Sequence, residues 1–111
     1  MIISVIVRRL KEGKTYEDFR EAWLPDKPFG VPTRVVSAQR LEDPRDIVTI
    51  GFSDMPLEEA EAFLERVGPQ EAGRHDRVDD VIDGDVTRYF YLQVGDDDFT
   101  DEAGVEAARR R

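Results

Sequence analysis

The stretch IISVIVRRL, residues 2–10, carries β-branched residues at both even and odd positions. A strand with one exposed face alternates apolar and polar residues, so this pattern predicts a strand whose two faces are both buried. The stretch IVTIGFS, residues 47–53, has the same character, with Val48 and Ile50 on one parity and Ile47 on the other. We therefore expect both strands in the interior of a sheet.

Two further strands complete the predicted sheet. The stretch RVVSAQRL, residues 34–41, is followed by the turn EDPRD, residues 42–46. It should therefore form an antiparallel hairpin with the strand that comes next. The stretch VTRYFYLQV, residues 86–94, predicts the fourth strand, because its mostly apolar even positions alternate with odd positions that are more polar. The odd positions are Thr87, Tyr89, Tyr91 and Gln93.

A first helix follows the first strand. Thr15 and Asp18 have the spacing of a capping box, so the helix should begin near Tyr16. Aromatic residues then recur at steps of three and four, and Pro25 ends the helix. The next segment, PDKPFGVPT at residues 25–33, predicts an ordered but irregular loop.

A second helix should begin after Asp54, which is placed as its cap. Gly68 and Pro69 then predict a break, so that the second half forms a separate or kinked helix up to Gly84. Apolar spacing of three to four resumes after the break. The residues expected on the sheet-facing stripe of this second half are Ala72, His75, Val78 and Ile82.

The order strand, helix, strand, strand, helix, strand predicts an α+β, ferredoxin-like βαββαβ fold, with a four-stranded antiparallel sheet and helices on one face. Its first and third strands are central, in agreement with their apolar residues on both parities. Because helices cover one face only, the other face needs a second cover, which the sheet of a partner subunit would supply. We expect one domain over residues 1–94 and a charged, flexible tail over 95–111, in which a short helix can form.

Composition excludes several classes of function. The 111 residues include 25 acidic and 16 basic side chains, and the formal charge of −9 disfavours nucleic acid and anionic membrane surfaces as partners. The absence of cysteine excludes disulfides, zinc-thiolate sites and thiol nucleophiles, and fits a reducing cytoplasm, where we expect the protein.

With this element order, the chain resembles the dimeric α+β barrel superfamily, which includes antibiotic-biosynthesis-monooxygenase-like domains and related isomerases and haem-degrading oxygenases. The resemblance covers residues 2–94 and rests on YEDFREAW at 16–23, the loop after it and VTRYFYLQV at 86–94. It implies a homodimer paired through the sheets, with a cavity for small, often aromatic molecules between sheet and helices. The asparagine, tryptophan and histidine of haem-degrading relatives cannot be carried over, because this sequence has no asparagine.

His75 is the candidate catalytic residue, because it is the one histidine and has an ordinary pKa near neutrality. The alternative is a structural histidine that is hydrogen-bonded to Glu71 or Asp79. The same three residues, spaced by four, have the helical spacing of metal ligands. They would leave most of a coordination sphere unfilled, so we expect neither a metal nor a cofactor.

Aromatic side chains gather on the first helix, its loop and the neighbouring strands, where they could form the walls of a site for a planar ligand. The alternative is that they pack in the core and the dimer interface. The candidate ligand-binding residues are Tyr16, Phe19, Trp23, Phe29, Phe52, Tyr89 and Tyr91. Three arginines on predicted strands, Arg34, Arg40 and Arg88, are expected to pair with acids, with a ligand carboxylate as the alternative.

Two functions remain open from the sequence. The first is binding of a small aromatic or polyketide-like molecule by a cofactor-independent monooxygenase or isomerase, with His75 as general base. The second is a non-catalytic dimeric metabolite-binding or structural module, in which His75 is a structural residue.

Overall fold

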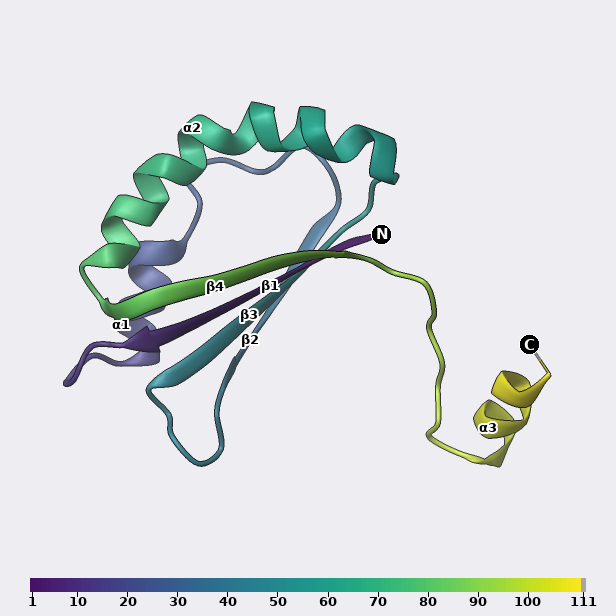
Figure 1. Ribbon diagram of the computed structural model, residues 1–111. Coiled ribbons are helices and arrows are strands. Elements are labelled where there is room, and N and C mark those ends of the chain that lie inside the picture. The colour runs from purple at the N-terminus through teal and green to yellow at the C-terminus, as the bar shows by residue number, and fades with distance from the viewer. Residues whose placement is uncertain (111) are drawn as a thin grey trace.

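The computed structural model describes residues 1–110 and contains one four-stranded antiparallel sheet of order β2-β3-β1-β4 (Figure 1). The predicted ferredoxin-like fold is confirmed, and so is the central position of the two strands with apolar residues on both faces. The strands are β1 at Ile2–Leu10, β2 at Thr33–Gln39, β3 at Asp46–Ser53 and β4 at Ile82–Leu92.

The first helix, α1 at Tyr16–Trp23, begins at the predicted capping box. The backbone N–H of Asp18 donates to Thr15 Oγ1 at 3.2 Å, and the Thr15 N–H donates to Asp18 Oδ2 at 2.8 Å. This second bond lowers the pKa of the Asp18 carboxyl, since it stabilises the carboxylate. Two backbone donors that the first turn cannot satisfy internally are thereby satisfied.

The second helix differs from the prediction. A short 3₁₀ turn, η1 at Leu57–Glu59, has Pro56 rather than Asp54 at its N-cap position, and α2 runs without a break over Ala60–Asp79. Pro69 lies inside α2, so the predicted separate second half is wrong. A proline in a helix removes one backbone donor and bends the axis, and Figure 1 shows α2 arching over the sheet as a single element.

The start of β4 was also predicted too late. The strand begins at Ile82, which was expected on the helix, and Gly84 lies within it rather than ending the helix. Gly84 has a φ of +75°, a conformation that favours glycine. The pairing of β4 with β1 shifts register between Val7 and Arg9, so the glycine belongs to a bulge in this strand pair.

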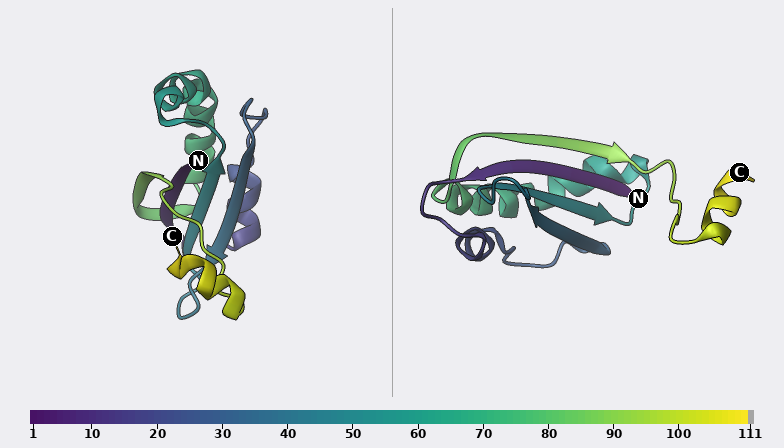
Figure 2. Two further views of the ribbon diagram at one scale, coloured as in Figure 1. Left: turned by 90° about the vertical axis from the view of Figure 1, so that its right-hand side faces the viewer. Right: turned by 90° about the horizontal axis from the view of Figure 1, so that it is seen from below.

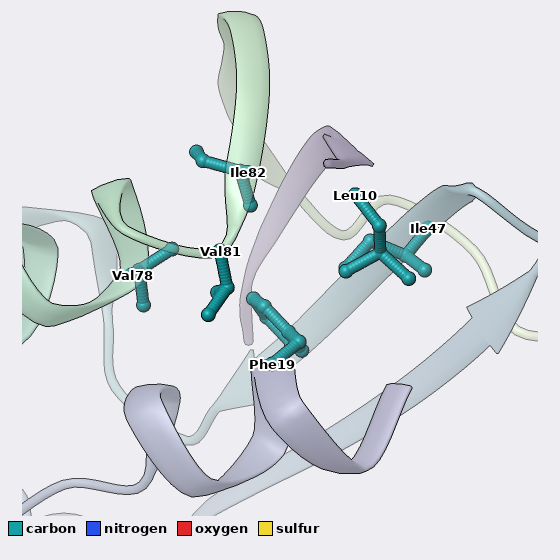
Figure 3. Close-up of a cluster of buried hydrophobic side chains, with 6 residues drawn as sticks. All are labelled: Leu10, Phe19, Ile47, Val78, Val81 and Ile82. Carbon is teal, nitrogen blue, oxygen red and sulfur yellow. The ribbon is translucent and has the colours of Figure 1, made fainter. Parts of the chain in front are cut away.

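Both α1 and α2 pack on the same face of the sheet, where a cluster of buried side chains joins them to β1, β3 and β4 (Figure 3). Phe19 of α1 stands at its centre and has no exposed surface. The cluster closes one end of the helix–sheet interface. Its members are Leu10, Phe19, Ile47, Val78, Val81 and Ile82.

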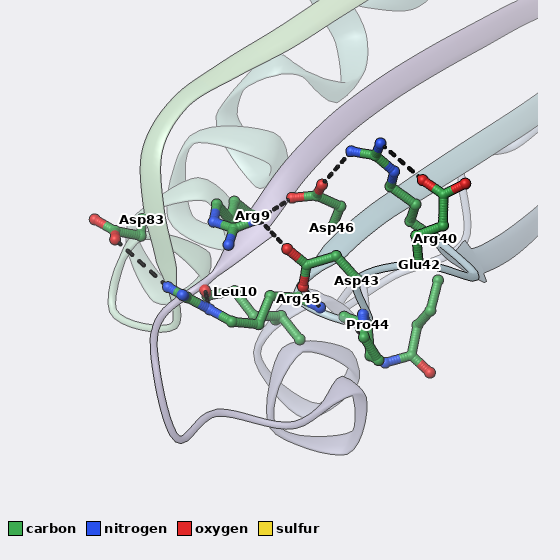
Figure 4. A network of polar contacts seen from close by, with 10 residues as sticks. Arg9, Leu10, Arg40, Glu42, Asp43, Pro44, Arg45, Asp46 and Asp83 are labelled. Atoms are coloured by element: carbon green, nitrogen blue, oxygen red, sulfur yellow. Dashed lines mark hydrogen bonds and ion pairs between the residues drawn. The ribbon is translucent and has the colours of Figure 1, made fainter.

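Ion pairs hold the β2–β3 hairpin against β1 (Figure 4). Arg9 Nη1 lies 2.9 Å from Asp43 Oδ2 and also bonds Asp46, and these bonds raise the pKa of Arg9. Arg45 Nε donates to a carbonyl of β1 at 3.0 Å, and its Nη2 lies 3.8 Å from Asp83 on β4. The network therefore connects three strands at the end of the sheet where the core cluster lies.

After β4 the chain leaves the sheet in an extended segment and ends in α3, Glu102–Arg109, which stands away from the sheet in Figure 1 and in the right-hand view of Figure 2. The Gly104 N–H donates to Asp101 Oδ1 at 3.0 Å and caps α3. The predicted tail, 95–111, extends to Arg111, which lies outside the described residues. Across residues 1–110, none of the helices is both long and apolar enough to cross a membrane.

Replacing Phe19 by alanine should lower the free energy of unfolding by about 3–5 kcal/mol, because it opens a cavity where α1, α2 and the sheet meet. Leu41→Ala is the control, since Leu41 is 100% exposed and its loss should change stability by less than about 0.5 kcal/mol. Urea denaturation followed by circular dichroism measures both. Equal effects of the two substitutions would contradict the assigned core.

Candidate functional site: a cavity between the long helix and the sheet

A cavity of about 310 Å³ lies between α2 and the helix-facing side of the sheet. Small-molecule sites span roughly 300–1,000 Å³, so this volume suits a small ligand. Room is left by small residues on the central strands, where Ser4 of β1 pairs with Gly51 of β3. A Cβ at Gly51 would stand 2.6 Å from Ser4 Oγ, so only glycine leaves the serine its place.

Aromatic side chains form much of the cavity wall. Trp23 comes from the end of α1, Phe29 from the loop after it, Phe63 from α2 and Phe90 from β4. The rings of Phe29 and Phe63 meet edge to face, with centroids 6.3 Å apart. Arg66 Nη2 donates to the Phe29 carbonyl at 3.2 Å and so fixes the loop to α2.

The cavity opens between η1, α2 and β4. Several apolar side chains from these elements line the cavity and are also exposed to solvent, so the entrance of the cavity is hydrophobic. They are Leu57, Leu64, Phe90 and Leu92.

The end of the cavity toward the core cluster is charged. Arg74 and Glu71 of α2 both line it and form an ion pair with each other. The Arg74 guanidinium also lies 5.4 Å from the ring centre of Trp23 and 5.6 Å from that of Phe29. Its side chain is 7% exposed, so this charge is stabilised by one carboxylate and two aromatic faces rather than by water.

Two arginines of the sheet complete this charged end. Arg8 of β1 is buried, donates to Thr49 Oγ1 at 3.1 Å and lies 5.2 Å from the ring centre of Phe19. Arg88 of β4 lines the cavity itself. Burial, followed by the like charges of Arg88 and Arg74, lowers the pKa of Arg8 to about 10. Arg8 therefore stays charged at neutral pH despite its burial, and we call Arg8, Arg74 and Arg88 the arginine layer.

His75 is half-buried beside the arginine layer, and it is not among the described side chains that line the cavity. Its Nε2 lies 2.7 Å from Arg88 Nη2 and 3.7 Å from Glu71 Oε2. A guanidinium only donates, so Nε2 accepts this bond and the ring proton sits on Nδ1. Burial and the charge of Arg88 lower the pKa of His75, since both disfavour the imidazolium.

The structure divides the seven aromatic candidates among three environments. Trp23 and Phe29 are brought together at the cavity, and Tyr91 borders it from β4, although the Tyr91 ring lies 6.4 Å from that of Tyr89. Tyr16 and Phe19 belong to the core of α1. Phe52 and Tyr89 stand on the opposite parity of β3 and β4 from the cavity-lining Gly51 and Phe90, so they occupy the face of the sheet that α1 and α2 leave open.

The expected ion pairs of the strand arginines are found for one of the three. Arg40 follows β2 and lies 3.2 Å from both Asp46 and Glu42. Arg34 is exposed on β2, whereas Arg88 bonds the neutral imidazole and faces the cavity. Within residues 1–110, no three His, Cys, Asp or Glu side chains are grouped so that they could hold a metal ion.

Sequence reasoning missed Arg8, Arg74, Phe63 and Phe90. Arg74 was missed because the break expected at Pro69 also reset the predicted stripe, whereas Phe63 lies before that break and Arg8 and Phe90 lie on strands. In the continuous helix the sheet-facing residues keep one phase, with steps of four, three, four, three and four. They are Ala60, Leu64, Val67, Glu71, Arg74 and Val78.

Comparison with solved structures gives matches over most of the chain. A solved structure from Chloroflexus aurantiacus, assigned as an antibiotic biosynthesis monooxygenase, matches with a TM-score of 0.60 and 18% sequence identity. The match covers 86% of this chain and 96% of that one. A solved structure from Nitrosomonas europaea with the same assignment matches with a TM-score of 0.54 and 19% sequence identity. This match covers 86% of this chain and 100% of that one. The chain has the fold of the dimeric α+β barrel superfamily.

A third member of this superfamily, an uncharacterized NIPSNAP domain protein from Burkholderia xenovorans, matches with a TM-score of 0.59 and 18% identity over 85% of this chain and 95% of that one. The predicted resemblance to the dimeric α+β barrels is therefore confirmed for the fold. No protein-family model and no curated protein matches the sequence.

The single histidine allows a direct test of the site's electrostatics. The imidazole Hε1 signal in a pH titration by NMR should give a pKa for His75 below its ordinary value of 6.5. Arg88→Met should raise this pKa, since it removes both the bond to the neutral ring and the repulsion of the imidazolium. Arg20→Met, on the exposed side of α1, is the control and should leave the titration unchanged.

The depressed pKa has a consequence for stability. The unfolded chain binds a proton at His75 at higher pH than the folded chain does, so stability should fall as pH is lowered from 7 through 6.5 and below. His75→Gln, which keeps an acceptor for Arg88 but does not titrate, should flatten this dependence above about pH 5.5. An unchanged slope in the variant would contradict the assignment.

Proposed function

We propose that this protein is a homodimer that binds a small aromatic molecule in the cavity between α2 and the sheet. The aromatic wall of the cavity carries the proposal, since planar rings can stack on Trp23 or meet the edges of Phe29 and Phe63. The mouth between α2 and β4 gives such a molecule a route of entry.

The open face of the sheet supports the dimer. Val36, Ile50, Val5 and Tyr89 are paired in one row across all four strands, on the face opposite the cavity. Val36 and Tyr89 are 38% and 58% exposed in the single chain. A broad apolar face of this kind marks an interface, and the resemblance to dimeric α+β barrels implies pairing through it.

The arrangement of His75 favours binding without catalysis. A general base needs a free lone pair within reach of the substrate, whereas Nε2 of His75 holds the bond from Arg88. We assign His75 the role of orienting Arg88 at the cavity. The monooxygenase or isomerase alternative is supported by two of the matching structures, and it would need Arg88 to release this nitrogen.

The cavity is tested with N-phenyl-1-naphthylamine, a neutral aromatic dye that fluoresces in apolar surroundings. The protein should bind it, and Ala60→Phe should weaken binding by at least about tenfold because Ala60 lines the cavity. Ala62→Phe, on the exposed side of the same helix, is the matched control and should bind as the unchanged protein does. Equal binding by both variants would overturn the proposed site.

The interface is tested by Ile50→Lys, which places a charge in the middle of the open face. The unchanged protein should elute as a dimer in size-exclusion chromatography with light scattering, and the variant as a folded monomer, since a buried unpaired charge strongly disfavours association. Leu41→Lys adds the same charge at a fully exposed position and should remain dimeric. A monomeric unchanged protein would refute the interface.

A further inference from the structure

We infer that the ligand of this cavity carries an anionic group, such as a carboxylate or sulfonate, which binds at the arginine layer while its aromatic body fills the apolar part. The inference rests on the proposed function and specifies the class of molecule.

The balance of charge at this end of the cavity is positive. Arg8, Arg74 and Arg88 contribute three positive charges, Glu71 contributes one negative charge, and His75 is neutral while it accepts from Arg88. This balance contrasts with the formal charge of −9 for the whole chain. Although the chain has 25 acidic residues, the ion pair found for these guanidinium groups among the described residues is that of Arg74 with Glu71.

Unused hydrogen-bonding groups point in the same direction. Arg74 Nε is buried and has no hydrogen-bond partner among the described residues, although its side chain lines the cavity. Buried donors in folded proteins are almost always satisfied, so a ligand oxygen is the natural acceptor for this N–H. Glu71 Oε1 is the matching unsatisfied acceptor, which a hydroxyl next to the anionic group could satisfy.

The rest of the cavity limits the size and polarity of the ligand. Beyond the charged end its wall is mostly aromatic and aliphatic, from Phe29 and Phe63 to Leu64 and Leu92. A sugar phosphate or nucleotide would leave its many polar groups against this apolar wall. One anionic group on an aromatic body fits both ends, which favours an aromatic acid over those ligands.

The test compares two dyes with one skeleton. 8-Anilinonaphthalene-1-sulfonate differs from N-phenyl-1-naphthylamine by its sulfonate, and it should bind at least about tenfold more tightly. Ala60→Phe should weaken the binding of both dyes by at least about tenfold, and Ala62→Phe should weaken neither. If neither dye binds, the proposed function and this inference both fail. If the neutral dye binds and the sulfonate gives no gain, the cavity stands and the inference fails.

Two substitutions locate the anionic group, and a third is their control. Arg88→Met should weaken binding of the sulfonate dye by about tenfold, and Glu71→Gln should strengthen it several-fold by removing a competing negative charge. For both variants the change in binding of the sulfonate dye should exceed the change in binding of the neutral dye, since the substitutions alter the charge that faces the sulfonate. Arg20→Met removes an exposed charge and should affect neither dye.

Partly unfolded chains also bind the sulfonate dye, so the gain expected for Glu71→Gln supports the inference only where near-ultraviolet circular dichroism shows native aromatic packing. Circular dichroism should show that both variants keep the fold. Unchanged sulfonate binding in Arg88→Met and Glu71→Gln would overturn the inference.

Discussion

The ion pair between Glu71 and Arg74 is the interaction on which the interior of this protein depends. It sits in the row of α2 that otherwise carries apolar residues onto the sheet, between Val67 and Val78. Removing one partner would leave a buried charge without compensation, which proteins tolerate poorly. The pair therefore fixes where the apolar packing of α2 stops and where a polar site begins.

This boundary separates two regions with different properties. On one side, the cluster around Phe19 is closed and carries the stability of the helix–sheet interface. On the other side, Ser4 and Gly51 present little side-chain volume toward α2, and the space left above them is part of the cavity. Arg8 bridges the two, because its guanidinium faces Phe19 and donates to Thr49 on the cavity wall. The closed core and the cavity thus lie at opposite ends of one interface.

Much of the fold could be predicted because it follows from local rules. Apolar residues on both parities identified β1 and β3 as central, and the Thr15 box located the start of α1. The cavity was predicted only as a general expectation, and three of its aromatic residues were among the seven candidates. The prediction of the second half of α2 failed at Pro69, since local propensity predicts a break there, whereas packing along α2 offsets the loss of one backbone hydrogen bond.

The sequence by itself determined the order of the elements, the two central strands and the apolar character of both sheet faces, because these depend on neighbours within a few residues. Tertiary structure alone decided which residues of α2 face the sheet, and with them the arginine layer. Arg8 and Arg74 are 66 positions apart in the sequence, and each looks like an ordinary surface charge in its own segment. Only the crossing of α2 over the sheet brings them, beside Arg88, to one end of a cavity, where the burial of Arg8 and Arg74 strengthens the field of these two charges.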